Sequence, residues 1–101
     1  MADVTKYSVL FYGGQDGYVG ARSQIVLFSD KDVLGYVRFH DEGMPFPDDV
    51  EQSDGTIYMH LPSAELRNVL DVLRNEAPVS FYFASGRAFL GTQSEPIGEG
   101  E

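Results

Sequence analysis

One stretch, residues 61–92, constrains the fold of this chain more than any other: LPSAELRNVLDVLRNEAPVSFYFASGRAFLGT. Its first half predicts an amphipathic helix, because large apolar residues recur at positions i, i+3, i+4 and i+7. Ser63 is the predicted N-cap of this helix, and Pro78 ends it. The apolar stripe that should face a core comprises Leu66, Val69, Leu70 and Leu73.

The second half of the stretch predicts a β-hairpin. Apolar and smaller residues alternate along residues 79–84, as in a half-buried strand. The dipeptide Ser85-Gly86 is a two-residue turn of the type that hairpins favour. If residue 84 pairs with residue 87, Tyr82 lies opposite Phe89, and the two strands then agree on which face is apolar.

The residues before this stretch read as strands that need the helix as a cover. The order β-β-β-β-α-β-β predicts an α+β fold in which one helix packs on one face of an antiparallel sheet of about six strands. We expect a single domain over residues 1–101, with a frayed end at residues 1–4 and an acidic, flexible tail at residues 93–101. The predicted early strands are residues 7–12, 24–29, 33–40 and 56–61.

The composition excludes several classes of site and location. The chain has no cysteine, which excludes disulfides, thiolate metal sites and a cysteine nucleophile. No apolar run approaches the length of a membrane span, and the N-terminus lacks a signal-peptide core. We therefore expect a soluble, cytoplasmic protein that does not bind a membrane.

The net charge of −9 argues against nucleic acid as a partner, because such a field repels a phosphate backbone. In topology alone, four strands followed by a helix resemble the Whirly-type and PUR-type folds that bind single-stranded nucleic acid. That resemblance carries over no residues. Only Arg22, Arg38 and Arg87 are basic residues of the predicted strands, against sixteen acids in the chain. We expect no nucleic-acid partner.

Alternation within the strands assigns a second sheet face that the helix cannot cover. Aromatic residues and arginine dominate it, which is the composition of interface hot spots. One helix shields two or three strands, so either the sheet curls over this face or another chain covers it. We favour another chain and predict a homodimer on this face. The candidate partner-binding residues are Tyr36, Arg38, His40, Tyr58, His60, Tyr82 and Phe89.

The two histidines offer the only plausible catalytic or metal cluster. His40 is followed by Asp41 and Glu42, and His60 lies in the next strand, but the pairing of these strands cannot be read from the sequence. We favour the interpretation that both histidines lie at a solvated strand end. We expect no metal, no cofactor and no catalytic residue, since phosphate-loop, dinucleotide-binding and nucleophile-elbow motifs are absent from the sequence.

These observations favour a small acidic protein that acts by protein–protein interaction, through self-association, binding of a further protein partner, or both. One alternative is an enzyme that acts on a small ligand or uses a metal, with His40, His60 and nearby carboxylates as its site. Another alternative is an acidic inhibitor or immunity-type protein that blocks a basic partner site. The sequence leaves both alternatives open.

Overall fold

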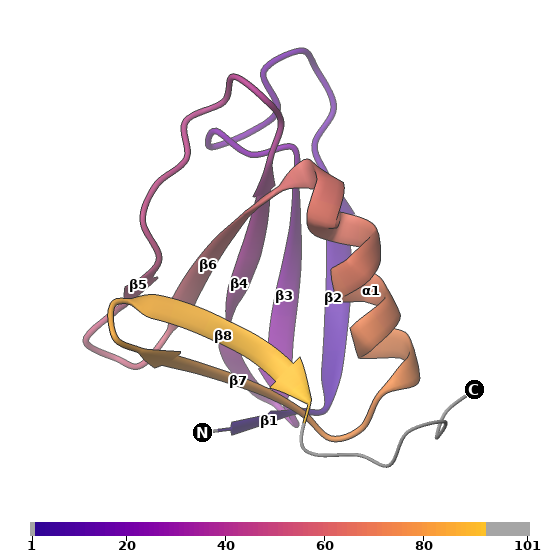
Figure 1. The fold of residues 1–101 in the computed structure, drawn as a ribbon, viewed down its shortest axis with the longest axis vertical. Coiled ribbons are helices and arrows are strands. Elements are labelled where there is room, and N and C mark those ends of the chain that lie inside the picture. The colour runs from indigo at the N-terminus through magenta and orange to yellow at the C-terminus, as the bar shows by residue number, and fades with distance from the viewer. Residues whose placement is uncertain (1, 93–101) are drawn as a thin grey trace.

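The fold is α+β, as the sequence predicts, in a computed structural model that describes residues 2–92. Across these residues no helix has the length and apolarity needed to cross a membrane. Figure 1 shows the elements in chain order. They are β1 (Ala2–Val4), β2 (Lys6–Phe11), β3 (Ser23–Ser29), β4 (Asp32–His40), β5 (Val50–Glu51), β6 (Ile57–Pro62), the 3-10 turn η1 (Ser63–Glu65), α1 (Leu66–Asn75), β7 (Val79–Ala84) and β8 (Arg87–Thr92).

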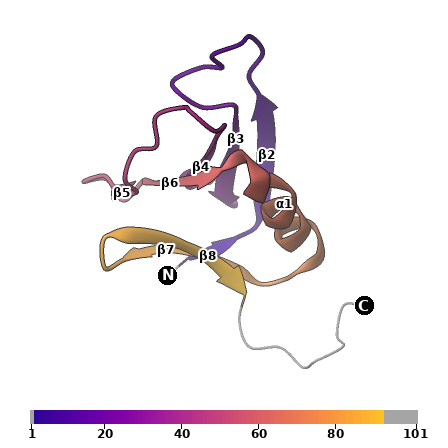
Figure 2. The same ribbon diagram turned by 45° about the horizontal axis from the view of Figure 1, so that its top comes forward.

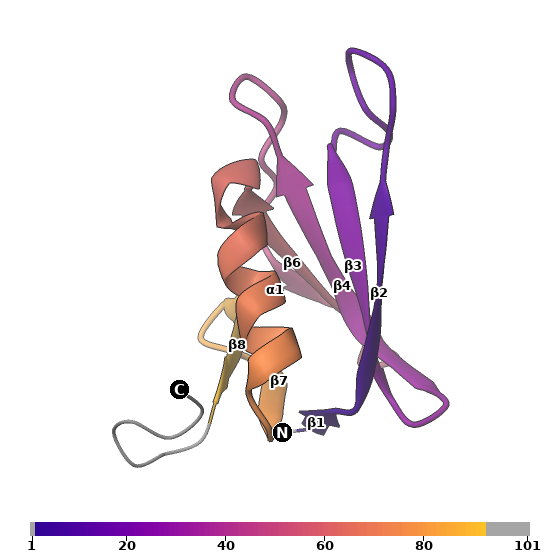
Figure 3. The same cartoon turned by 90° about the vertical axis from the view of Figure 1, so that its right-hand side faces the viewer.

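The strands form two sheets, where the sequence predicted one. The larger sheet has the order β2-β3-β4-β6-β5, and the smaller has the order β1-β7-β8. Helix α1 and the smaller sheet lie on the same side of the larger sheet (Figure 3). The predicted six strands in one sheet are therefore wrong in number and arrangement, because the C-terminal hairpin packs as a second layer and does not extend the first.

The larger sheet is also not wholly antiparallel, since β4 and β6 run parallel. A parallel pair needs a long connection to return the chain to its starting end, and residues 41–56 supply it. The short strand β5 forms within this connection and pairs with β6 at the far end. The parallel register places Tyr36 beside Tyr58 and Arg38 beside His60.

The smaller sheet confirms one prediction made from the sequence and contradicts another. The hairpin register is confirmed, with Tyr82 opposite Phe89, and the turn residues Ser85 and Gly86 both have positive φ angles. The frayed end predicted for residues 1–4 is wrong, because Ala2–Val4 pairs with β7. The three residues of β1 are too few to show a strand alternation in the sequence. They form a strand because they pair with β7 of the hairpin.

The core lies between the larger sheet and its two covers. Ile25, Leu27, Val37, Phe39 and Ile57 bury the inner face of this sheet against Val69 of α1 and Phe81 of β7. The predicted stripe of α1 is confirmed: its remaining leucines, at 66, 70 and 73, pack against the same cluster. Gly35 allows close approach of the layers, because a Cβ atom there would overlap the Ile57 carbonyl and the Phe81 ring.

Asp49 joins the two sheets through its carboxylate. Its Oδ1 accepts a hydrogen bond from the backbone N–H of His60 in β6 at 2.8 Å, and its Oδ2 accepts one from the backbone N–H of Ala88 in β8 at 2.9 Å. Both N–H groups lie on strand edges beyond the reach of the two-residue strand β5. The carboxylate thus satisfies two donors that no strand pairs, and it holds the smaller sheet against the larger one.

We predict that Asp49→Ala lowers the free energy of unfolding by about 2–4 kcal/mol, because it leaves two backbone donors without their charged acceptor. Urea denaturation measures the change. Asp48→Ala is the matched control, since Asp48 is exposed and no hydrogen bond of its side chain occurs within residues 2–92. Equal stabilities of the two variants would contradict the bridging role of Asp49.

Candidate functional site

The outer face of the larger sheet, turned away from α1 and the smaller sheet, is the candidate site. Strand alternation from β2 to β6 places one set of side chains on it. Within residues 2–92 no helix or strand packs over this face (Figures 2 and 3). We call it the outer face, and its residues below the covering loops are Lys6, Ser8, Leu10, Gln24, Val26, Phe28, Val33, Tyr36, Arg38, Val50 and Tyr58.

Two stacked tyrosines and an arginine form the centre of the outer face. The rings of Tyr36 and Tyr58 stack with centroids 5.0 Å apart and planes at 23°. The Arg38 guanidinium carbon lies 4.9 Å from the Tyr58 centroid and 5.9 Å from that of Tyr36, within cation–π range. Arg38 Nε also donates a 2.9 Å hydrogen bond to Gln24 Oε1. All four side chains are half-buried, so they form an ordered, accessible group.

Apart from Ser8, the rest of the outer face is apolar or basic. At its lower end Lys6 Nζ lies 5.4 Å from the centroid of the Phe28 ring. Leu10, Val33 and Val50 are large apolar side chains exposed by 55%, 42% and 46%. The register positions of this face hold no carboxylate, although the chain has sixteen. The outer face therefore differs in electrostatic character from the acidic protein around it.

The two histidines close the upper end of the outer face as a buried pair. His40 is 3% exposed and His60 8% exposed, so the predicted solvated strand end is wrong. His40 Nε2 and His60 Nδ1 are 2.8 Å apart, and His40 Nδ1 is 2.6 Å from the Gly20 carbonyl oxygen. The ring of the loop residue Phe46 lies against His40, with the two ring centroids 5.2 Å apart.

These distances fix the protonation of the neutral pair. A carbonyl oxygen only accepts, so His40 Nδ1 must carry a proton and donate it to Gly20. In neutral His40 the other nitrogen, Nε2, is then an acceptor, and His60 Nδ1–H donates to it. A proton on both of the facing nitrogens would put two donors 2.8 Å apart. The pair is therefore compatible with the neutral state and disrupted by double protonation.

Burial is the main reason why the pKa of His60 lies below its usual value, and the neighbouring His40 and Arg38 lower it further. The carboxylate of Asp49 acts in the opposite direction. In the part of the chain that the structure describes, no group of three or more histidine, cysteine or acidic residues could hold a metal ion. Burial therefore favours the neutral form of His60.

The structure divides the predicted partner-binding residues into three groups. Tyr36, Arg38 and Tyr58 share the centre of the outer face. His40 and His60 lie at its upper end, where Phe46 lies against His40. Tyr82 and Phe89 belong to the smaller sheet, where their rings stack with centroids 5.1 Å apart. Placing these last two on the same face as the others was wrong, because the hairpin forms a separate sheet.

A second polar network lies in the loops above the larger sheet. Arg22 Nε donates to Asp41 Oδ2 at 2.8 Å, and Ser63 Oγ donates to Asp41 Oδ1 at 2.6 Å. These two hydrogen bonds, that of Ser63 first, hold the pKa of Asp41 below its usual value. Ser63 is thus not the predicted N-cap: its hydroxyl makes no capping hydrogen bond and binds Asp41.

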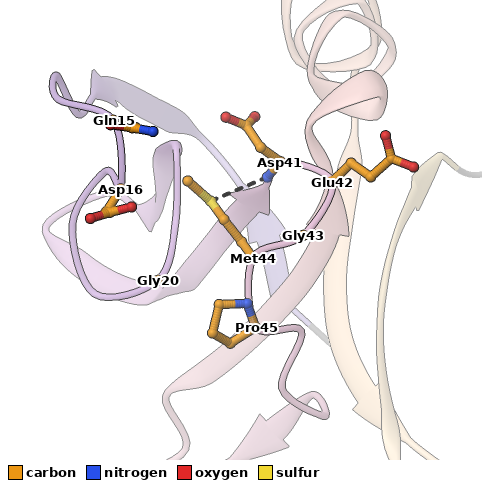
Figure 4. Close-up of a pocket in the computed structure, with 8 residues that line it drawn as sticks. All are labelled: Gln15, Asp16, Gly20, Asp41, Glu42, Gly43, Met44 and Pro45. Atoms are coloured by element: carbon orange, nitrogen blue, oxygen red, sulfur yellow. Dashed lines mark hydrogen bonds between the residues drawn. The ribbon is translucent and has the colours of Figure 1, made fainter.

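A cleft of about 530 Å³ opens beside this network, between residues 15–20 and 41–45 (Figure 4). The backbone N–H of Asp41 donates to Met44 Sδ at 3.3 Å within it. Acidic side chains line the cleft, but Asp41 already binds Arg22 and Ser63. The carboxylate of Asp41 therefore has a structural role, since both of its oxygens accept hydrogen bonds within the fold.

Sequence reasoning missed two residues of the outer face. Gln24 accepts a hydrogen bond from Arg38, and Lys6 adds a second cation at the lower end. The first strand was predicted to begin at Tyr7, one residue after Lys6. Alternation would have placed both residues on the second face, together with Val26 and Phe28.

Comparisons of the chain with protein-family profiles, curated proteins and solved structures found no match.

We predict that the free energy of unfolding falls as the pH is lowered from about 7.5 to 5. The folded-state pKa of His60 lies below its unfolded value, so the unfolded chain binds more protons in this range. The stabilisation is complete above the unfolded pKa of about 6.5 and is lost as the pH falls, by at most about 1.4 kcal/mol per pH unit for one proton.

Urea denaturation at several pH values measures this slope for the wild type and for His60→Asn. The asparagine amide can donate to His40 Nε2 but does not titrate, so the variant should show a shallower slope. Identical slopes for the two proteins would mean that His60 does not carry the pH dependence.

Proposed function

We propose that the protein acts by binding protein through its outer face. The stack of Tyr36, Tyr58 and Arg38 is the observation that carries this proposal. Tyrosine and arginine are enriched among the residues that contribute most to binding energy, and here they lie at the centre of an open sheet face. Exposed aliphatic residues surround them, as expected of contacts that exclude water.

The size and setting of the outer face support the same proposal. It spans five strands, and its exposed apolar side chains lie toward both sheet edges, with Leu10 on β2 and Val50 on β5. Three large aliphatic side chains exposed on one open sheet face, beside two aromatic rings, form a surface that a partner can bury. A protein surface is the partner that can cover such an area while meeting its tyrosine hydroxyls and its arginine.

The alternative of an enzyme based on His40 and His60 has weaker support. His40 uses both ring nitrogens in hydrogen bonds. Within residues 2–92 only Nε2 of His60 has no hydrogen bond, and His60 is 8% exposed. A general base needs a free nitrogen within reach of a substrate proton. In this geometry the pair orders a strand end, and the protein-binding proposal gives a role to the open surface beside it.

The alternative of an acidic inhibitor needs acids that are free to meet a basic partner. The acidic connection between β4 and β6 uses three of its carboxylates within the fold. Asp41 binds Arg22 and Ser63, Asp49 bridges the sheets, and Asp54 accepts from the backbone N–H of Thr56 at 2.9 Å. This internal use of the acids favours a binding surface elsewhere, on the outer face.

Self-association is the first form of protein binding to test, since the sequence predicts a homodimer on this face. A cytoplasmic location and the absence of nucleic-acid partners also remain predictions. The predicted tail at residues 93–101 lies outside the described residues.

We predict that the wild-type protein sediments as a dimer at micromolar concentration and that Leu10→Asp converts it to a monomer. The substitution places a charge on an exposed residue of the outer face, so it should weaken binding without loss of stability. Val19→Asp is the matched control, because Val19 is 53% exposed and lies in the loop between β2 and β3, outside the register positions of the outer face. A wild-type protein that is monomeric at this concentration would exclude the homodimer, and equal behaviour of both variants would remove the outer face from the contact.

A further inference from the structure

Arg38 is held in place by the protein, yet it has hydrogen-bond donors left over. Its Nε binds Gln24, and its guanidinium lies against Tyr58 and Tyr36. Within residues 2–92 its two Nη groups donate no hydrogen bond. A guanidinium has five N–H donors in a rigid, planar arrangement, so four of them remain for a partner.

Arg22 shows what a structural arginine looks like in the same chain. Its Nε donates to Asp41, its Nη1 donates to the carbonyl oxygens of Tyr12 and Gly14, and its Nη2 donates to that of Gln15. Both arginines are partly buried, but only Arg22 has its guanidinium satisfied by the fold. Arg67, Arg74 and Arg87 are exposed, and within residues 2–92 their guanidinium groups form no hydrogen bond.

The positioning of Arg38 lowers the cost of binding. Stacking on an aromatic pair and the bond to Gln24 remove side-chain freedom before a partner arrives, so less entropy is lost on association. The Nη groups present the planar fork that accepts a carboxylate through two parallel hydrogen bonds. Because the outer face contains no carboxylate, the acceptor has to come from another surface.

We propose that Arg38 is a receptor for a carboxylate of an acidic protein partner that binds the outer face. This inference rests on the proposed function and names the chemistry of the partner. Phosphate could use the same fork, but the outer face also carries exposed aliphatic residues, which suit an Asp or Glu side chain presented on a protein surface. The outer face of a second copy holds no carboxylate, so self-association on this face would leave the Nη donors of Arg38 without an acceptor, and the carboxylate comes from a different protein.

Lys6 extends the same complementarity to the other end of the face. It is held over the Phe28 ring, and within the described chain it forms no salt bridge. Four residues and two strand spacings separate it from Arg38 in the register, which corresponds to about 16 Å. A partner segment with acids spaced over five extended residues would reach both cations.

The test is an NMR titration of the full-length, 15N-labelled protein with two blocked hexapeptides, Val-Glu repeated three times and Val-Gln repeated three times. It is run at pH 7 and an ionic strength of about 0.15 M, where screening limits long-range repulsion from the acidic chain. We expect the Glu peptide to shift the amides of Gln24, Tyr36, Arg38 and Tyr58 saturably, with a Kd at least tenfold lower than that of the Gln peptide.

Three variants and one further ligand make the result decisive. Arg38→Gln should abolish the tenfold preference for the Glu peptide. Arg38→Lys should weaken the preference several-fold, because an ammonium lacks the two parallel donors of a guanidinium. Arg67→Gln, on the exposed surface of α1, should leave the preference unchanged. Equal affinities for the two peptides, no binding of either at millimolar concentration, or a preference that survives Arg38→Gln would overturn the inference. Inorganic phosphate that shifts these amides with equal or higher affinity than the Glu peptide would also overturn it.

Failure of this inference is distinguishable from failure of the proposed function. If both peptides bind equally and Leu10→Asp removes that binding, the outer face binds protein without a carboxylate anchor. If neither peptide binds while Leu10→Asp still converts a dimer to a monomer, the face is an interface and Arg38 is not its receptor.

Discussion

The parallel pairing of β4 with β6 is the contact on which the rest of the structure depends. Its register stacks Tyr36 on Tyr58, brings Arg38 over both rings, and places His40 within hydrogen-bond distance of His60. A shift of this register by one residue would turn Tyr58 of β6 into the core and Ile57 and Leu61 outward. The open aromatic face and the buried histidine pair are therefore two consequences of one pairing.

The long connection that this pairing requires is held by its own side chains. Asp41 is tied to Arg22 and Ser63 at one end, and Asp49 is tied to two strand edges at the other. Between them the ring of Phe46 lies against His40. Asp49 and Asp54 of this segment thus accept hydrogen bonds from backbone N–H groups in a connection whose two prolines interrupt regular strand pairing. The outer face is left without carboxylates, and its two cations remain available.

Local pattern predicted the local parts of the fold. The stripe of α1 and the hairpin register were readable because each depends on residues close in the sequence. The two-sheet arrangement was not readable, because it depends on how Phe81 packs over Gly35 and on the Asp49 bridge across 39 residues to Ala88. Alternation correctly put Tyr36, Arg38 and Tyr58 on one face, but only the register shows that they touch. Tyr82 and Phe89 were misplaced for the same reason.

We propose that a protein partner covers the outer face at Tyr36, Arg38 and Tyr58. Hydroxyl-radical footprinting with mass spectrometry tests it most directly, because both tyrosines are accessible in the isolated chain and react at a rate set by exposure. Purified protein labelled alone at nanomolar concentration is compared with the same protein at micromolar concentration and in extract of its source cells. We expect protection of Tyr36 and Tyr58 in the micromolar sample, in the cell extract, or in both, with unchanged labelling of Tyr82 and Phe89. Equal labelling of Tyr36 and Tyr58 in all three samples would contradict it.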